Sequence, residues 1–184
     1  MRFFFLIIQN NRLSVLFVVY SVNSFQLNIM EQEKNFPVNG IPFRILYADD
    51  DEDDHFFFDD VLSKLKFEKW VKIFVDGEKL LTYLFEPKVK LPDVLFLDYN
   101  MPRKNGEECL LEIKKNPSLK DLPVIMYSTI LHDDVADRLY DKGAYFFVCK
   151  TDMKSLEKIL HKIFTLLIIK KAQRPTRAEF IITA

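Results

Sequence analysis

Short apolar segments alternate with longer amphipathic segments along the chain from about residue 41 onward. The short segments are β-prone and predict strands at 43–48, 71–75, 93–98, 123–127 and 145–149. The longer segments repeat apolar residues at helical spacing and predict helices at about 53–66, 78–85, 106–116, 132–142 and 152–168. In the first helix we expect the apolar side to be formed by Phe56, Phe57, Leu62 and Leu65.

This alternation of strands and helices, without hairpin signals, predicts an α/β fold in which helices cover both faces of a parallel sheet. The third strand, 93–98, is apolar up to its last residue, as expected for a strand buried on both faces. Right-handed crossovers leave few topologies for such a doubly wound sheet. Its functional site is expected outside the carboxyl ends of the strands, where the winding direction reverses.

Residues 1–29 form an apolar leader that differs from the rest of the chain, with Arg2 and Arg12 as its only charged residues. Its apolar runs, 3–8 and 13–22, are each shorter than the roughly 20 residues of a membrane-spanning helix. Three interpretations stay open: a mis-assigned start before a true start at Met30, a signal peptide, or an anchor at the membrane surface.

The remaining chain divides into a linker at 30–42, a folded domain at 43–168 and a C-terminal tail at 169–184. The tail carries basic residues and then a short apolar end. It is interpreted either as a frayed end or as a docking segment, for a partner or for the edge of the domain itself.

Composition excludes several classes of protein. The 184 residues are 49% hydrophobic and 29% charged with only 4 Gly, which argues against disorder and collagen-like repeats. A net charge of −1 gives no basic field for nucleic acid. The two cysteines, Cys109 and Cys149, lack metal-ligand spacing, so we expect reduced thiols in a cytoplasmic protein.

Polar side chains stand at the carboxyl ends of four predicted strands. They are Asp49, Asp50, Asp98, Ser128, Thr129 and Lys150. Clustered carboxylates resist ionisation unless a cation lies among them, and oxygen ligands suit Mg²⁺. A metal and an ammonium beside a carboxylate nucleophile predict a site that receives a phosphoryl group.

Within this set, Asp98 is the expected nucleophile because it ends the central and most apolar strand. Asp49 and Asp50 are the expected metal ligands, directly or through water. Ser128 is expected to donate a hydrogen bond to a phosphoryl oxygen, with Thr129 next to it as a further hydroxyl. The following acids, 51–54, are interpreted as charges that favour the start of a helix.

The motifs around these residues resemble the receiver domain of two-component response regulators. They are 45–51, 94–102 with Gly106 eight residues after Asp98, 123–128, and Gly143-Ala144 leading to Lys150. The resemblance covers about 43–168 and implies a flavodoxin-like (βα)5 fold with strand order 2-1-3-4-5. It also implies Mg²⁺-dependent phosphorylation of Asp98 by a histidine kinase or a histidine phosphotransfer protein. The backbone carbonyl of Asn100 would then be a further metal ligand.

The acidic first loop and the residues after Asp98 resemble stand-alone receivers, which signal through phosphorylation-dependent binding of a protein partner. The resemblance therefore implies a phosphoacceptor and not a turnover enzyme, with no nucleic acid as partner and no membrane unless 1–29 is an anchor. Two positions depart from the family. Thr151 replaces the usual proline after the lysine, and Phe147 occupies the position of the switch aromatic, which is often tyrosine.

Two other functions stay open. An aspartyl phosphatase of the haloacid dehalogenase type would also use a strand-end Asp and Mg²⁺, but it needs a second Asp at the position of Asn100. A degenerate receiver would bind partners without phosphorylation, and the complete set of acids argues against it.

Overall fold

The computed structural model describes residues 5–9, 12–16, 42–129, 132–169 and 174–184. The chain forms two compact units, Met1–Phe36 and Pro37–Ala184. In the first unit, strands β1 (Phe5–Gln9) and β2 (Arg12–Leu16) pair antiparallel. The start proposed at Met30 and nearly all of the linker lie outside the described residues, so the interpretations of the leader stay predictions.

The second unit alternates strands and helices as predicted, with element ends displaced by a few residues. In chain order its elements are β3 (Phe43–Ala48), α2 (Glu52–Lys64), β4 (Lys69–Phe74), α3 (Gly77–Leu84), β5 (Val94–Asp98), α4 (Gly106–Lys115), β6 (Val124–Ser128), α5 (Asp133–Asp141), β7 (Phe146–Cys149) and α6 (Met153–Ile169). A short 3₁₀ helix, η1 (Arg177–Glu179), and strand β8 (Ile181–Ile182) follow. Among the helices described, none combines the length and the apolar character needed to cross a membrane.

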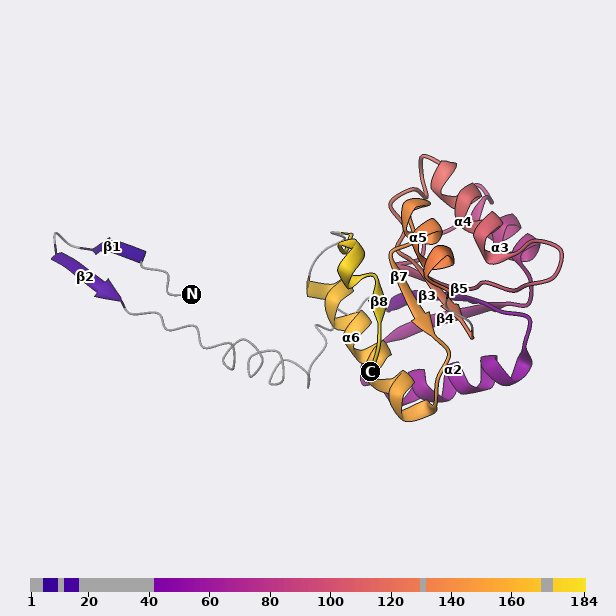
Figure 1. Ribbon diagram of the computed structural model, residues 1–184, viewed down its shortest axis with the longest axis horizontal. Helices are drawn as coiled ribbons and strands as arrows, with labels where there is room; N and C mark the ends of the chain where they lie inside the picture. The colour runs from indigo at the N-terminus through magenta and orange to yellow at the C-terminus, as the bar shows by residue number, and fades with distance from the viewer. Residues whose placement is uncertain (1–4, 10–11, 17–41, 130–131, 170–173) are drawn as a thin grey trace. The chain divides into compact units, whose positions relative to one another are not determined.

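The sheet has the order β4-β3-β5-β6-β7-β8, and all its neighbouring strands are parallel. Its first five strands have the predicted order 2-1-3-4-5, which confirms the flavodoxin-like doubly wound fold. Figure 1 shows α2 and α6 on one face of the sheet and α3, α4 and α5 on the other. The winding direction reverses between β3 and β5, so the carboxyl ends of these two strands mark the expected site.

The sheet has a sixth strand, β8, which the sequence analysis did not predict. The tail returns along β7, where the Phe147 amide donates to the Phe180 carbonyl over 2.8 Å. The Tyr140 hydroxyl on α5 also donates to the Pro175 carbonyl over 3.1 Å, and Phe180 is fully buried. Of the two interpretations of the tail, docking on the edge of its own domain is therefore the one observed.

Helix α2 presents a different face to the sheet than predicted. Its buried residues are Phe58, Val61 and Leu62, whereas Phe56 is 69% exposed and Phe57 is 45% exposed. Positions 58, 61, 62 and 65 share one helical face because they are spaced by three and four residues. Phe56 falls outside that spacing and Phe57 lies at its margin, four residues before Val61, so the prediction was wrong for both.

Aromatic side chains fill the layer between the sheet and helices α2 and α6. Tyr47 on β3 stacks on Phe58 with ring centroids 4.3 Å apart, and Phe58 meets Phe96 on β5 at 4.9 Å. Phe164 on α6 continues the layer, 6.0 Å from Phe96. Because Tyr47 lies near the carboxyl end of β3, this layer reaches the edge where the functional side chains gather.

Candidate functional site

The carboxyl ends of three strands bring two buried carboxylates and an ammonium group together. Asp49 follows β3, Asp98 ends β5 and Lys150 follows β7. The Lys150 Nζ lies 2.7 Å from Asp49 Oδ2 and 3.0 Å from Asp98 Oδ1. Asp49 is 1% exposed and Asp98 is 4% exposed, so both carboxylates are withdrawn from solvent.

Three of the predicted metal ligands lie close enough to share one cation. One carboxylate oxygen from each of Asp49, Asp50 and Asp98 lies within 4.8 Å of the others. Asp50 is exposed, which leaves one side of this group open. An all-oxygen donor set of this size fits a hard divalent cation such as Mg²⁺.

Asp98 is held at both of its carboxylate oxygens. The Asn100 amide donates to Oδ2 over 2.6 Å, while Lys150 contacts Oδ1. Burial and the charge of Asp49 raise the pKa of Asp98, and the Lys150 ammonium opposes that rise. The fold therefore keeps a carboxylate in a place where burial disfavours its ionised form, and the Lys150 ammonium and the Asn100 amide favour it.

Asp49 is oriented by groups that the sequence analysis did not single out. The Tyr47 hydroxyl donates to Asp49 Oδ2 over 2.6 Å, and the Asp51 amide donates to Oδ1 over 3.0 Å. The His55 Nε2 lies 2.7 Å from the Asp49 carbonyl oxygen, and His55 is half-buried. Tyr47 was detectable in principle, because residues two apart on a strand share a face.

Asp54 also belongs to the site, although it was interpreted as a charge at the start of a helix. Its Oδ2 lies 2.6 Å from the Lys150 Nζ, across 96 positions of sequence. Burial alone would lower the pKa of Lys150, but hydrogen bonds to Asp49 and Asp54 and the charge of Asp98 raise it above its ordinary value. Lys150 is therefore a permanent cation bordered by three carboxylates.

The loop after β7 directs Lys150 to the site without the proline that is usual in the receiver domains which the sequence resembles. In the described part of the chain no peptide bond is cis, and this includes the bond between Lys150 and Thr151. The Lys150 amide donates to the Ser128 carbonyl over 2.8 Å, which extends the pairing of β6 with β7. Backbone pairing thus places the base of the lysine side chain.

The remaining predicted residues have different environments. The Ser128 hydroxyl is buried and has no hydrogen-bond partner among the residues described. Thr129 is exposed, so it does not share the buried position of Ser128. Phe147 is fully buried, and its ring centroid lies 6.4 Å from that of Phe180 on the returning tail.

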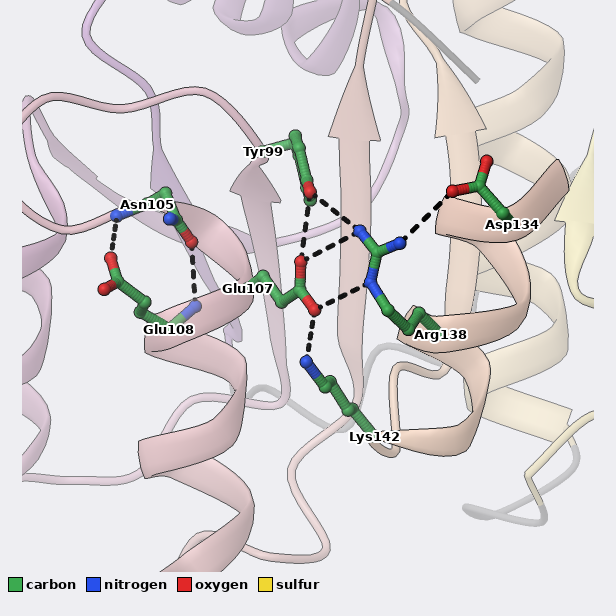
Figure 2. Close-up of polar contacts among 7 residues, drawn as sticks. All are labelled: Tyr99, Asn105, Glu107, Glu108, Asp134, Arg138 and Lys142. Atoms are coloured by element: carbon green, nitrogen blue, oxygen red, sulfur yellow. Dashed lines mark hydrogen bonds and ion pairs between the residues drawn. The ribbon is translucent and has the colours of Figure 1, made fainter. Parts of the chain in front are cut away.

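A second polar cluster, which we call the Glu107 cluster, joins α4 to α5 beside the residue that follows Asp98 (Figure 2). The Tyr99 hydroxyl donates to Glu107 Oε2 over 3.0 Å, and Arg138 Nε donates to Glu107 Oε1 over 3.1 Å. Lys142 pairs with the same Glu107 oxygen. The hydrogen bond from Arg138 lowers the pKa of Glu107 to about 2, with burial opposing and Lys142 and Tyr99 assisting.

We expect the Glu107→Gln variant to lose about 2 kcal/mol of stability at neutral pH. The ordinary pKa of 4.5 applies to the unfolded chain and about 2 to the folded protein, so the carboxylate stabilises the fold above about pH 5. This contribution disappears as the pH falls from about 5 to about 2. Urea unfolding of both proteins across that range measures the difference, with Glu52→Gln as a control for losing an exposed carboxylate. A difference that does not depend on pH would contradict the assignment.

Gly106 allows α4 to begin directly against the backbone of Asp98. A Cβ atom at position 106 would lie 2.1 Å from the Asp98 carbonyl oxygen and 3.0 Å from the Tyr99 Cα. Both neighbours are backbone atoms, so they cannot move aside as a flexible side chain can. Glycine is therefore required where this helix meets the end of β5.

We expect Gly106→Ala to destabilise the domain by about 2 to 3 kcal/mol, because the added methyl group forces α4 away from β5. Urea unfolding measures the loss. Ser118→Ala, a surface substitution beyond the end of α4, serves as the control. A loss below about 0.5 kcal/mol, the range of ordinary surface changes, would show that the close approach is not required.

Comparison with known proteins adds independent information. The family model of the response regulator receiver domain matches residues 45–161. The response regulator Rcp1 of Synechocystis is 30% identical over 128 residues, which are 66% of this chain and 86% of that protein. The chemotaxis protein CheV1 of Helicobacter pylori is 25% identical over 124 residues, which are 66% of this chain but only 38% of that protein.

Solved structures agree with these sequence matches. The Mn²⁺-bound form of response regulator Rcp1 has a TM-score of 0.64 and 27% identity, over 73% of this chain and all 100% of that one. The phosphorylated cyanobacterial phytochrome response regulator RcpA has a TM-score of 0.64 and 28% identity, over 74% of this chain and 100% of that one.

Proposed function

Because this chain belongs to the response regulator receiver family, we propose that it accepts a phosphoryl group on Asp98 from a histidine kinase or a histidine phosphotransfer protein. The phosphorylated domain then signals by binding a protein partner. The observation that carries this proposal is the buried Asp98 carboxylate beside both the Lys150 ammonium and the Asp49 carboxylate.

In this proposal a Mg²⁺ ion is held by the side chains of Asp49, Asp50 and Asp98 and by the backbone carbonyl of Asn100. The first three supply an oxygen-only group of suitable size. When bound, the ion offsets the negative charge of the carboxylates and of the phosphoryl oxygens. The likeness to a Mn²⁺-bound receiver supports a divalent cation at this place.

Asp98 and Lys150 have separate roles in the proposed phosphoryl transfer. An oxygen of Asp98 forms the new bond to phosphorus while the bond between phosphorus and the donor histidine nitrogen breaks. Lys150 binds a phosphoryl oxygen through its ammonium, which loses its contact to Asp98 as that carboxylate becomes an acyl phosphate. The phosphoryl group would come from a cytoplasmic donor, so the cytoplasm is the proposed location.

Ser128 and Phe147 connect this chemistry to a change of shape. The buried Ser128 hydroxyl is without a partner among the described residues, so a phosphoryl oxygen would be its first strong acceptor. In this proposal Ser128 moves toward that oxygen, Phe147 follows, and the face formed by α5, β7 and α6, where the tail strand β8 pairs with β7, changes shape. This is a shift between two states, biased by a contact that only one of them makes.

The competing functions are less well supported. A haloacid dehalogenase-type phosphatase would need a titrating acid at position 100, and an asparagine amide cannot exchange protons in that role. A degenerate receiver has no need for the buried, charge-compensated carboxylates that are found here. The similarity to proteins described as response regulators also favours signalling over turnover.

The proposal is tested by intact-mass measurement after the full chain is incubated with acetyl phosphate, with Mg²⁺ or with EDTA. We expect a mass increase of one phosphoryl group that requires Mg²⁺. Beryllofluoride, a phosphoryl mimic, should bind under the same conditions and change the amide NMR signals of Ser128 and Phe147. A folded protein that shows neither the adduct nor beryllofluoride binding would contradict the proposal.

A further inference from the structure

Lys150 contacts three carboxylates, and these carboxylates have different roles in the proposed chemistry. Asp49 and Asp98 are the buried pair, assigned to the metal and to the phosphoryl group. Asp54 stands apart, because it lies in the first turn of α2 and its side chain is 27% exposed. Its distance to the Lys150 Nζ, 2.6 Å, is nevertheless the shortest of the three.

Of the three carboxylates, Asp54 is the one that the proposed chemistry assigns neither to the metal ion nor to the phosphoryl group. A metal ion draws on the oxygens of Asp49, and phosphorylation converts Asp98 from a carboxylate into an acyl phosphate. An ammonium group has three donor positions, so one can stay on Asp54 while others turn to the phosphoryl oxygens. Asp54 can therefore hold Lys150 throughout the reaction without itself contacting the reacting atoms.

The loop that carries Lys150 restrains the lysine side chain only weakly, so a contact that holds the ammonium group has an effect. Thr151 follows the lysine and lacks the ring that restrains a proline. Backbone pairing with Ser128 fixes only the start of a long side chain that has four rotatable bonds. The Lys150 side chain is 11% exposed, and Asp54 contacts its ammonium group from α2.

We propose that Asp54 is a positioning residue that aims the Lys150 ammonium at the phosphoryl group and ties the loop after β7 to helix α2. This inference rests on the proposed function, because it assigns Lys150 to the phosphoryl oxygens. The alternative role for Asp54 is competition with the phosphoryl group for the Lys150 ammonium. The two roles predict changes of opposite sign when the carboxylate is removed.

The first test measures the affinity for beryllofluoride at saturating Mg²⁺ in the full chain and three variants. We expect Asp54→Asn to bind about tenfold more weakly, a usual loss when a residue that supports a binding group is removed. Asp53→Asn removes the same charge from an exposed position in the same helical turn and should change the affinity less than twofold. Asp54→Glu, which keeps the carboxylate, should lose less than Asp54→Asn. Unchanged or tighter binding by Asp54→Asn would overturn the inference.

The second test separates this inference from the proposed function. In the Mg²⁺-bound protein, the ¹⁵N-labelled ammonium group of Lys150 should give a resolved NMR signal because Asp54 slows its exchange with water. We expect that signal to weaken markedly in Asp54→Asn, in which Asp98 still contacts the ammonium, and to persist undiminished in Asp53→Asn. If it persists undiminished in both, Asp54 does not hold the lysine. If the unmodified chain binds no beryllofluoride, the proposed function fails while the ammonium signal still decides the role of Asp54.

Discussion

Replacing Asp98 with asparagine is expected to abolish the phosphoryl adduct formed with acetyl phosphate and Mg²⁺. The amide lacks the negative oxygen that attacks phosphorus, and it also removes one of the carboxylates that hold the cation. The fold should survive, because burial and the charge of Asp49 raise the pKa of Asp98, so its carboxylate is not well stabilised in place. Intact mass measures the adduct, and urea unfolding checks that the variant is at least about as stable as the parent.

Asp59→Asn is the matched control, since Asp59 is an exposed acid on α2 and its loss changes the net charge by the same amount. This control should form the adduct as the unmodified chain does. A full adduct on folded Asp98→Asn would show that another residue is the acceptor.

Replacing Lys150 with methionine is expected to lower the free energy of unfolding by about 3 kcal/mol in EDTA, the usual effect of removing one partner from a buried ion pair. Methionine keeps much of the side-chain volume but leaves the buried Asp49 and Asp98 without their nearest cation. Mg²⁺ should restore part of the loss, because a bound cation replaces the missing positive charge and stabilises the folded state by linkage.

Urea unfolding with and without Mg²⁺ measures both effects, and Lys158→Met, at an exposed position of α6, serves as the control. The unmodified chain should gain less stability from Mg²⁺ than Lys150→Met does. Equal stability of Lys150→Met and the control in EDTA would contradict the role of Lys150 as the cation that offsets these carboxylates.

Most of the fold was predictable because its strands are continuous apolar segments that end in polar residues. Asp98, for example, closes the fully buried strand β5. Strand β8 was not predictable as part of the sheet, because its two residues give no periodic pattern and their pairing with β7 depends on the course of the tail. Helix α2 shows a related limit: Phe57 and Phe58 lie four and three residues before Val61, so this spacing alone does not separate the exposed ring from the buried one.

The candidate site was predictable where residues stand at strand ends, since topology alone brings those ends together. Asp49, Asp98 and Lys150 meet for this reason. Asp54 and Glu107 lie on helices, and their partners depend on the rotation of α2 and on the distance between α4 and α5. Such contacts join distant parts of the sequence without any local spacing that indicates them.

The central claim, that Asp98 carries the phosphoryl group, is tested most directly by reducing the phosphorylated chain with borohydride. Reduction converts an aspartyl phosphate into homoserine, so peptide mass spectrometry then identifies the residue that was modified. We predict homoserine at position 98 after treatment with acetyl phosphate and Mg²⁺, and aspartate at 49, 50 and 54. Homoserine at any of those three positions, with aspartate retained at 98, would contradict the account.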